Sequence, residues 1–245
     1  MFEIYKREIG SFFNSLTGYV VIIVYLLVNS LFMWVLPGNW NIFDSAYAGM
    51  DTLFLLSPWI FLFLVPAVTM RSIAEEKRAG TLELLLTRPL TERQIVYGKL
   101  LAALTLVLFA LLPGVIYYIS VYHLGEVPGN LDKGGILGAY IGLFFLASVY
   151  ASCGVFASSL SDNQVVAFIL AVLISLFMYI GFDAFAMLPG LKQLDEFLST
   201  LGINEHYSSM SRGVIDLRDI SYFIITIVIA AEATRMVLLS RKWKK

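Results

Sequence analysis

Six long apolar segments alternate with short polar segments along the chain. Each is long enough for a helix to cross the apolar core of a bilayer, which is about 30 Å thick and needs about 20 helical residues. The apolar runs are continuous rather than alternating, which excludes the strands of a membrane β-barrel. The pattern therefore predicts an all-α polytopic membrane protein with six transmembrane helices at residues 18–36, 53–70, 95–122, 135–160, 164–188 and 220–239.

The composition supports lipid as the solvent of this chain. Of its 245 residues, 59% are hydrophobic and 14% are charged, with a mean hydropathy of +0.80, whereas soluble domains have about 25% charged residues. Its 18 Phe, 13 Tyr and 4 Trp residues exclude a disordered chain, and a net charge of −1 provides no basic surface for nucleic acid. The single cysteine, Cys153, excludes an intrachain disulfide and a cysteine-based metal cluster.

The distribution of basic residues predicts the orientation in the membrane. With six spans, the two termini and two of the five connections lie on one side. Of the 17 Lys and Arg residues, only four fall on the other side: Lys133, Lys192, Arg212 and Arg218. Because cytoplasmic segments carry the excess of Lys and Arg, we expect both termini to be cytoplasmic.

Local sequence signals refine the predicted helices. Pro58 and Pro66 are expected to break the second span and Pro113 to kink the third. Capping boxes are predicted at the starts of the third and fifth spans, Thr91-x-x-Gln94 and Ser161-x-x-Gln164. Helical spacing predicts an amphipathic helix on each membrane surface, one with Phe2, Ile4, Tyr5, Ile9, Phe12 and Phe13, and an outer one with Leu191, Leu194, Phe197, Leu198 and Leu201.

The cytoplasmic connection at residues 71–90 carries a short helix with defined ends. Gly80 permits a turn, Thr81 is expected as the N-cap, and Glu83 suits the positive end of the helix dipole. Pro89 ends the helix, because the residue before a proline avoids the helical conformation. A helix of about two turns is marginal alone and depends on contacts with other structure.

The surface of this short helix has two interpretations. Leu82, Leu85 and Leu86 share one face, with Leu84 beside them. These leucines either dip into the membrane interface or form a docking knob for a cytoplasmic partner. In the second interpretation, the charged residues that precede them orient the partner. These charged residues are Glu75, Glu76, Lys77 and Arg78.

The segment from Glu75 to Leu90, Glu-Glu-Lys-Arg-x-Gly-Thr-Leu-Glu-Leu-Leu-Leu-Thr-x-Pro-Leu, resembles the hallmark of ABC-2-type permease subunits. The resemblance extends over nearly the whole chain, taken as one transmembrane domain of residues 1–245. It includes the Asp162-Asn163-Gln164 turn and the segment Arg212-Gly-Val-Ile-Asp-x-Arg-Asp219. The latter is most similar to the gliding-motility-associated permease branch, which is related to the nitrous oxide reductase maturation branch.

This resemblance implies that the membrane domain and the ATP-binding site belong to separate chains. Residues 81–86 would correspond to the coupling helix, which inserts into a groove on an ATP-binding-cassette ATPase. The sequence has no G-x-x-x-x-G-K-[ST] phosphate loop, so ATP and Mg would be bound by the partner. This chain would have no catalytic site, cofactor or metal of its own. A second permease chain, identical or related, would complete the transporter in the bacterial inner membrane.

Two functions fit a subunit of this kind. The first is a permease that couples ATP hydrolysis to substrate movement, in a gliding-motility-type system. The alternative is a mechanotransmitting or assembly subunit that uses the same ATPase contact without moving a solute. A membrane-embedded enzyme would need paired intramembrane acids, grouped histidines or a metal motif, and the sequence has none of these.

A few polar residues in or near the spans are further candidates. Asp183, near the outer end of the fifth span, is either hydrated at the interface or functional. Glu232 and Arg235 either form a local pair on one helix face or serve subunit contact or gating. His123 and His206 are too far apart to suggest a metal site and are expected at the surface. Small polar residues either line a path or hold helices together: Asn29, Ser30, Ser148, Ser152, Ser158 and Ser159.

Overall fold

A computed structural model describes residues 1–45, 48–86, 90–126, 130–188 and 194–240. Over these residues the chain forms helices and no strands. Six helical segments are long and apolar enough to cross a membrane, which confirms the predicted all-α fold. They are Leu16–Val35, Asp51–Arg78, Glu92–Leu124, Lys133–Leu160, Gln164–Ala186 and Leu217–Ser240.

Several spans consist of more than one helical element. The first joins α2 (Leu16–Ser30) to a π-helical turn, η1 (Leu31–Val35), and the second continues from α3 (Asp51–Thr69) into α4 (Ala74–Arg78). The third comprises α6 (Glu92–Leu111) and α7 (Gly114–Leu124), and the fifth comprises α9 (Gln164–Leu176), η2 (Phe177–Gly181) and α10 (Phe182–Ala186). The fourth and sixth are single helices, α8 (Lys133–Leu160) and α13 (Leu217–Ser240). Shorter helices are α1 (Phe2–Phe13), α5 (Thr81–Leu86), α11 (Asp195–Ser199) and α12 (Ile203–Ser211).

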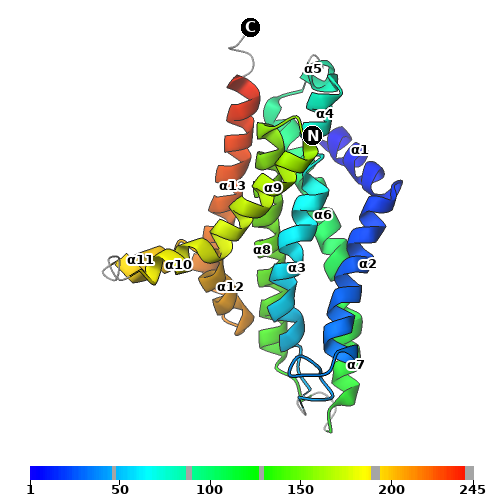
Figure 1. Cartoon of the computed structure of the whole chain (residues 1–245), viewed down its shortest axis with the longest axis vertical. Coiled ribbons are helices and arrows are strands. Elements are labelled where there is room, and N and C mark those ends of the chain that lie inside the picture. The colour runs from blue at the N-terminus through cyan, green and yellow to red at the C-terminus, as the bar shows by residue number, and fades with distance from the viewer. Residues whose placement is uncertain (46–47, 87–89, 127–129, 189–193, 241–245) are drawn as a thin grey trace.

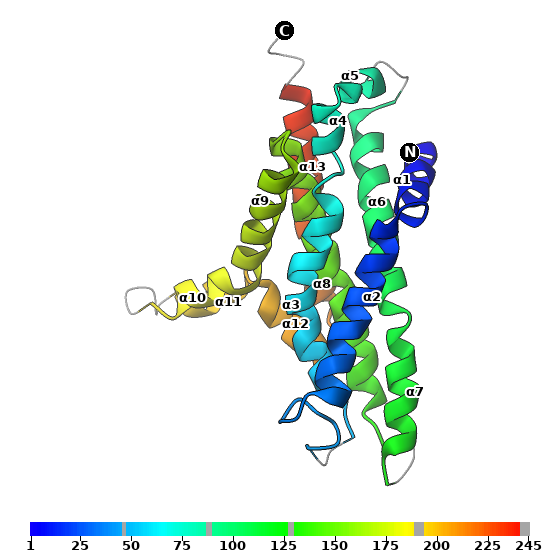
Figure 2. The same ribbon diagram turned by 45° about the vertical axis from the view of Figure 1, so that its right-hand side comes forward.

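The central helix of the bundle is α8, which packs against α3, α6, α9, α12 and α13. Around it, α1, α4 and α5 lie at one end of the molecule together with the C-terminal end of α13, whereas α7 ends at the other (Figures 1 and 2). The first residue and the last described residue are therefore at the same end, next to the α4–α5 hairpin.

The prolines of the second and third spans behave differently from one another. α3 runs without interruption through Pro58 and Pro66, so the prediction that they break this span is wrong. A proline lacks the N–H that would bond the carbonyl four residues earlier, and for Pro58 that carbonyl belongs to Phe54. The hydroxyl of Tyr207 donates to it at 2.8 Å and replaces the missing donor. At Pro113, where a kink is predicted, the helix is interrupted between α6 and α7.

The two predicted capping boxes also differ in outcome. At the start of α6, the Thr91 hydroxyl accepts the N–H of Gln94 and the Gln94 side chain accepts the N–H of Thr91, which confirms the box. At the start of α9 the prediction is wrong, because Asn163 is the cap and accepts the N–H of Val165 at 2.9 Å. Asparagine caps as well as serine does, and it directly precedes the first helical residue.

The two amphipathic surface segments are partly described. α1 confirms the helix predicted near the N-terminus. In the outer segment, α11 covers Asp195–Ser199, whereas Leu191 lies outside the described residues. α10 and α11 contact each other and extend sideways from the bundle (Figures 1 and 2).

Candidate functional site at the hairpin

Two short helices form a hairpin between α3 and α6. α4 ends at Arg78, and α5 begins at Thr81 after a turn through Ala79 and Gly80. Gly80 has a positive φ of 67°, which confirms the predicted glycine turn. The predicted N-cap is wrong by one residue, since Thr81 is already the first residue of α5. Its hydroxyl donates to the carbonyl of Glu76 at 3.4 Å.

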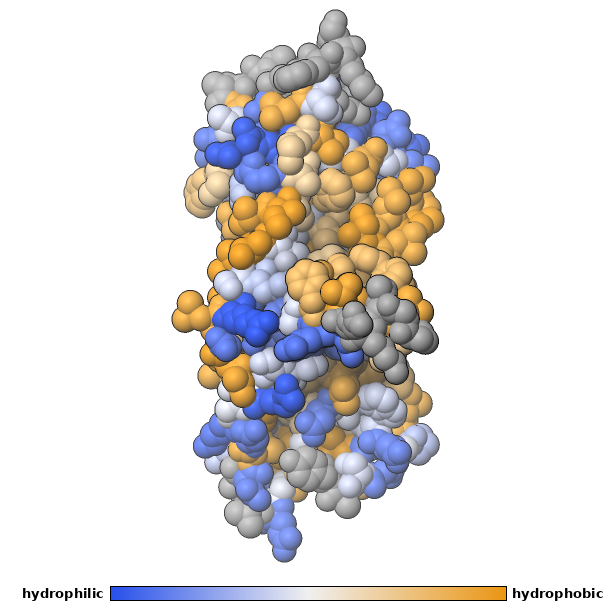
Figure 3. Space-filling view, turned by 90° about the vertical axis from the view of Figure 1, so that its left-hand side faces the viewer, coloured by the Kyte–Doolittle hydropathy of each residue, from blue (hydrophilic) through white to orange (hydrophobic). Residues whose placement is uncertain are grey.

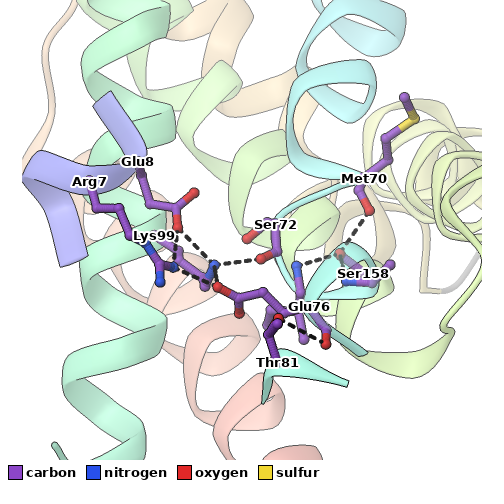
Figure 4. A network of polar contacts seen from close by, with 10 residues as sticks. Arg7, Glu8, Met70, Ser72, Glu76, Thr81, Lys99 and Ser158 are labelled. Carbon is purple, nitrogen blue, oxygen red and sulfur yellow. Dashed lines mark hydrogen bonds and ion pairs between the residues drawn. The ribbon is translucent and has the colours of Figure 1, made fainter. Parts of the chain in front are cut away.

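Ser158 of α8 fixes the base of this hairpin. Its hydroxyl accepts the N–H groups of Ile73 and Ala74, each at 2.9 Å, and donates to the carbonyl of Met70 at 2.9 Å (Figure 4). Backbone groups at helix ends have no partner within their own helix, and Ser158 pairs three of them at the junction of α3 and α4. This serine therefore holds helices together.

An ion cluster around the buried Lys99 joins the hairpin to α1 and α6. Lys99 projects from α6 with 1% of its side chain exposed, and its ammonium lies 2.9 Å from Glu8 and 3.0 Å from Glu76. It also donates to the carbonyl of Ser72 at 2.5 Å. Arg7 completes the cluster, 2.7 Å from Glu8 and 2.5 Å from Glu76 (Figure 4). Two cations and two carboxylates thus meet where three helices converge.

Sequence reasoning missed this cluster. In the sequence, Lys99 is only one of the 17 basic residues, near the start of the third span. The signal was a lysine within an apolar helix, since a charge at membrane depth normally requires a partner. One such partner, Glu8, is separated from Lys99 by 91 positions along the chain, so no local pattern could identify it.

The cluster shifts the pKa of two groups on α1. Burial acts to raise the pKa of Glu8, but the charge of Lys99 and hydrogen bonds from Arg7 and Lys99 outweigh burial, so the pKa is lowered from 4.5. Desolvation acts to lower the pKa of Arg7, and its contacts with Glu8 and Glu76 raise it overall. Both shifts favour the charged forms, so the cluster consists of ion pairs at neutral pH.

We expect acid to weaken the attachment of α1. Because the folded-state pKa of Glu8 is lowered, its stabilising contribution is fully present above the ordinary value of 4.5 and is lost as the pH falls through the lowered value. The thermal unfolding midpoint of the wild type should therefore decrease as the pH is lowered below 4.5. Glu8→Gln should make the midpoint less dependent on pH in this range. Glu3→Gln, in the exposed first turn of α1, should keep the wild-type profile. An E8Q profile identical to that of the wild type would contradict the assignment.

Most of the hairpin residues described as exposed are polar or charged. The exposed residues are Glu75, Arg78, Ala79, Gly80, Thr81 and Glu83. Leu82 is instead 2% exposed and belongs to the core of this chain, so its predicted place on an exposed docking knob is wrong. A helix as short as α5 needs apolar contacts to persist, and Leu82 supplies one. The side chains of Leu84, Leu85 and Leu86 lie outside the described part of the structure.

The four charged residues before the turn divide into two pairs. Glu76 faces the ion cluster, and Lys77 donates to the carbonyl of Ser159 on α8. These two side chains fix α4 to the bundle. Glu75 and Arg78 are exposed, and they are the charges of α4 that a partner can reach.

The chain matches a known protein family. Residues 60–240 match the model of the ABC-2 family transporter protein. The chain belongs to this family. The matched region contains the hairpin and ends with α13. No curated protein matches the chain.

Membership in the ABC-2 family defines the kind of subunit. This ABC-2 protein is a multi-pass membrane subunit of an ABC transporter, and the family implies an ABC ATPase as its partner. The family also implies that this subunit has no catalytic site of its own. Within the described residues, no group of three or more His, Cys, Asp or Glu side chains is placed to hold a metal ion.

The predicted pair in α13 is formed and extends to a second helix. Arg235 donates to Glu232 at 2.8 Å, and the other carboxylate oxygen of Glu232 lies 3.1 Å from Arg93 at the start of α6. The pair therefore joins α13 to α6 near the hairpin. Asp183, at the start of α10, accepts a hydrogen bond from Asn204 of α12 at 2.9 Å.

The two histidines occupy different environments. His123 is exposed, as predicted. His206 is 5% exposed, so the prediction of a surface residue is wrong. Its Nδ1 lies 2.7 Å from the Asp219 carboxylate and its Nε2 lies 2.9 Å from the carbonyl of Thr200. Because α12 folds back against the start of α13, these groups replace water as partners of the ring, which also stacks on Tyr222.

Proposed function

We propose that the α4–α5 hairpin docks the ABC ATPase, and that the chain couples ATP hydrolysis by that subunit to substrate movement across a bacterial inner membrane. One observation carries this proposal: the hairpin has an exposed polar side, with Glu75 and Arg78, and a base fixed to several helices. The ATPase contacts the exposed polar side, and the fixed base transmits the displacement of the hairpin to the helices. ATP and Mg belong to the ATPase in this proposal.

Three attachments lead from the hairpin into the bundle. Ser158 links it to α8, the helix that contacts most of the other spans. Lys99 links it to α6, and Arg7 links it to α1. Because protein interiors are close-packed and compress little, a shift of the hairpin must move these helices rather than be absorbed between them.

Docking also defines the orientation in this proposal. An ABC ATPase works in the cytoplasm, so the hairpin and both chain ends beside it would face the cytoplasm. The excess of Lys and Arg on this side supports the same orientation. The resemblance of residues 75–90 and 212–219 to gliding-motility-associated permeases further supports a gliding-motility-type system, a second permease chain, and one transmembrane domain over residues 1–245.

The alternative of a mechanotransmitting subunit is favoured by tight packing between α2, α3 and α6. The space enclosed between α2, α3 and α6 is about 10 Å³, with an apolar lining that includes Val21, Phe61 and Ala103. Vesicles that contain the chain and its ATPase separate the two functions. ATP-dependent flux supports a permease, whereas ATPase stimulation without flux supports mechanotransmission.

Charge reversal on the exposed side of α4 is expected to release the ATPase. Arg78→Glu should abolish both co-purification of the ABC ATPase and its stimulation in the reconstituted complex, because reversed charges repel at a complementary contact. Arg218→Glu is the matched control, since this exposed arginine lies at the far end of α13. It should change neither readout. Unaltered stimulation in R78E would refute docking at this face.

A further inference from the structure

A cavity of about 410 Å³ lies far from the hairpin, between the first turns of α3, the π-helical turn η2 and α12. Its apolar wall is formed by Phe54, Leu55, Tyr179 and Tyr207. Its polar wall comes mainly from α12. The residues that line this wall are Asn204, Ser208, Ser211 and Arg212.

The walls of this cavity are held in place by close packing. Tyr207 spans from α12 to the Phe54 carbonyl of α3. Behind it, α12 lies so close to α8 that a Cβ on Gly138 would overlap the carbonyl oxygen of Met210. Gly213, with a φ of 83°, turns the chain directly after Arg212. The cavity is thus formed before any ligand arrives, which reduces the entropic cost of binding.

Two opposite charges line the cavity without neutralising each other. Asp51 is in the first turn of α3 and Arg212 follows α12, and both side chains are exposed. In the part of the chain that the structure describes, neither has an ion-pair partner. A ligand that carries one positive and one negative group would complement both.

The level of the cavity along the bundle points to the membrane surface. On the side that carries α10 and α11, hydrophilic residues gather at mid-height, directly below a broad apolar region (Figure 3). α12 lies just below α10 (Figure 1). Such a change from apolar to polar surface is typical of the level at which lipid headgroups lie.

We propose that this cavity binds a phospholipid with a zwitterionic headgroup. The phosphate contacts the Arg212 guanidinium and the Ser208 hydroxyl, and the ammonium contacts the Asp51 carboxylate. The part of the acyl chains nearest the headgroup lies over Phe54 and Tyr179. An anionic phospholipid satisfies Arg212 but brings no cation to Asp51. This inference goes beyond the proposed function, because it concerns a cavity far from the docking hairpin.

Native mass spectrometry of the purified full chain tests the proposal. The protein is given equal amounts of phosphatidylethanolamine and phosphatidylglycerol with identical acyl chains. The wild type should retain phosphatidylethanolamine with a preference of roughly tenfold, as expected for one additional charge-assisted contact. Asp51→Asn should lose the preference and keep binding both lipids, whereas Arg212→Gln should weaken retention of both by roughly tenfold.

Controls separate this result from misfolding and from the docking proposal. Arg218→Gln removes an exposed arginine that does not line the cavity, and its lipid retention should match the wild type. Arg78→Glu should also retain lipid normally, so the two proposals can fail independently. Equal retention of both lipids by the wild type, retention of neither, unchanged selectivity in folded D51N, or unchanged retention in folded R212Q would each overturn the assignment.

Discussion

Replacing Lys99 with methionine is expected to lower the free energy of unfolding by about 3–5 kcal/mol and to remove stimulation of the ABC ATPase. The methionine fills a similar space but leaves Glu8 and Glu76 without the cation that lies 2.9 and 3.0 Å away in the wild type. Arg7 remains beside both carboxylates, so K99M leaves one negative charge uncompensated, and such a loss costs more than the ion pair itself contributes. Denaturant unfolding and ATP hydrolysis in the reconstituted complex measure the two effects.

A triple variant distinguishes lost charge balance from lost packing. Combining Lys99→Met with Glu8→Gln and Glu76→Gln removes the two carboxylates together with the cation, and Arg7 remains half-exposed in solvent. This variant should recover most of the unfolding free energy. If K99M alone is as stable as the wild type, the cluster does not hold the hairpin to α1 and α6.

Gly154→Ala is expected to cause the second large loss. A Cβ at this position would overlap Thr69 Oγ1 and lie 2.9 Å from Thr69 Cβ, so α8 and α3 cannot keep their spacing. Overpacking in a close-packed interior costs about 1–3 kcal/mol. This contact lies just before the junction where Ser158 holds the start of α4, so ATPase stimulation should fall along with the thermal unfolding midpoint.

The same contact offers a compensating variant. Thr69→Ala removes the Oγ1 and Cγ2 atoms that the new methyl group would meet and keeps only Cβ, 2.9 Å away, so the double variant T69A/G154A should be more stable than G154A. Gly10→Ala serves as the control, because a Cβ there meets only the Asn14 side chain at 3.8 Å. A fully stable G154A would show that the spacing of α3 and α8 is not limiting.

Features encoded locally could be predicted from the sequence. The six spans follow from apolar length, the turn before α5 from Gly80, and the cap of α6 from Thr91 and Gln94, since each depends only on neighbouring residues. The continuity of α3 could not be predicted in this way. It depends on Tyr207, which reaches the carbonyl of Phe54 from 153 positions further along the chain.

The candidate site shows the same limit. Its place in the 71–90 connection and the charged residues Glu75 and Arg78 could be identified from the pattern. The pattern could not show that Leu82 is buried, because burial of one face of α5 depends on how the hairpin packs on the bundle. Nor could it pair Lys99 with Glu8, or His206 with Asp219, since each pair forms only after separate helices come together.

Site-specific photo-crosslinking tests the central claim most directly. A benzophenone amino acid replaces Thr81, which is exposed at the start of α5, and a second variant carries it at Arg218, at the far end of α13. After irradiation of the assembled complex, docking at the hairpin predicts an adduct with the ABC ATPase from position 81 and none from position 218. An assembled complex that yields no ATPase adduct from position 81 would contradict it.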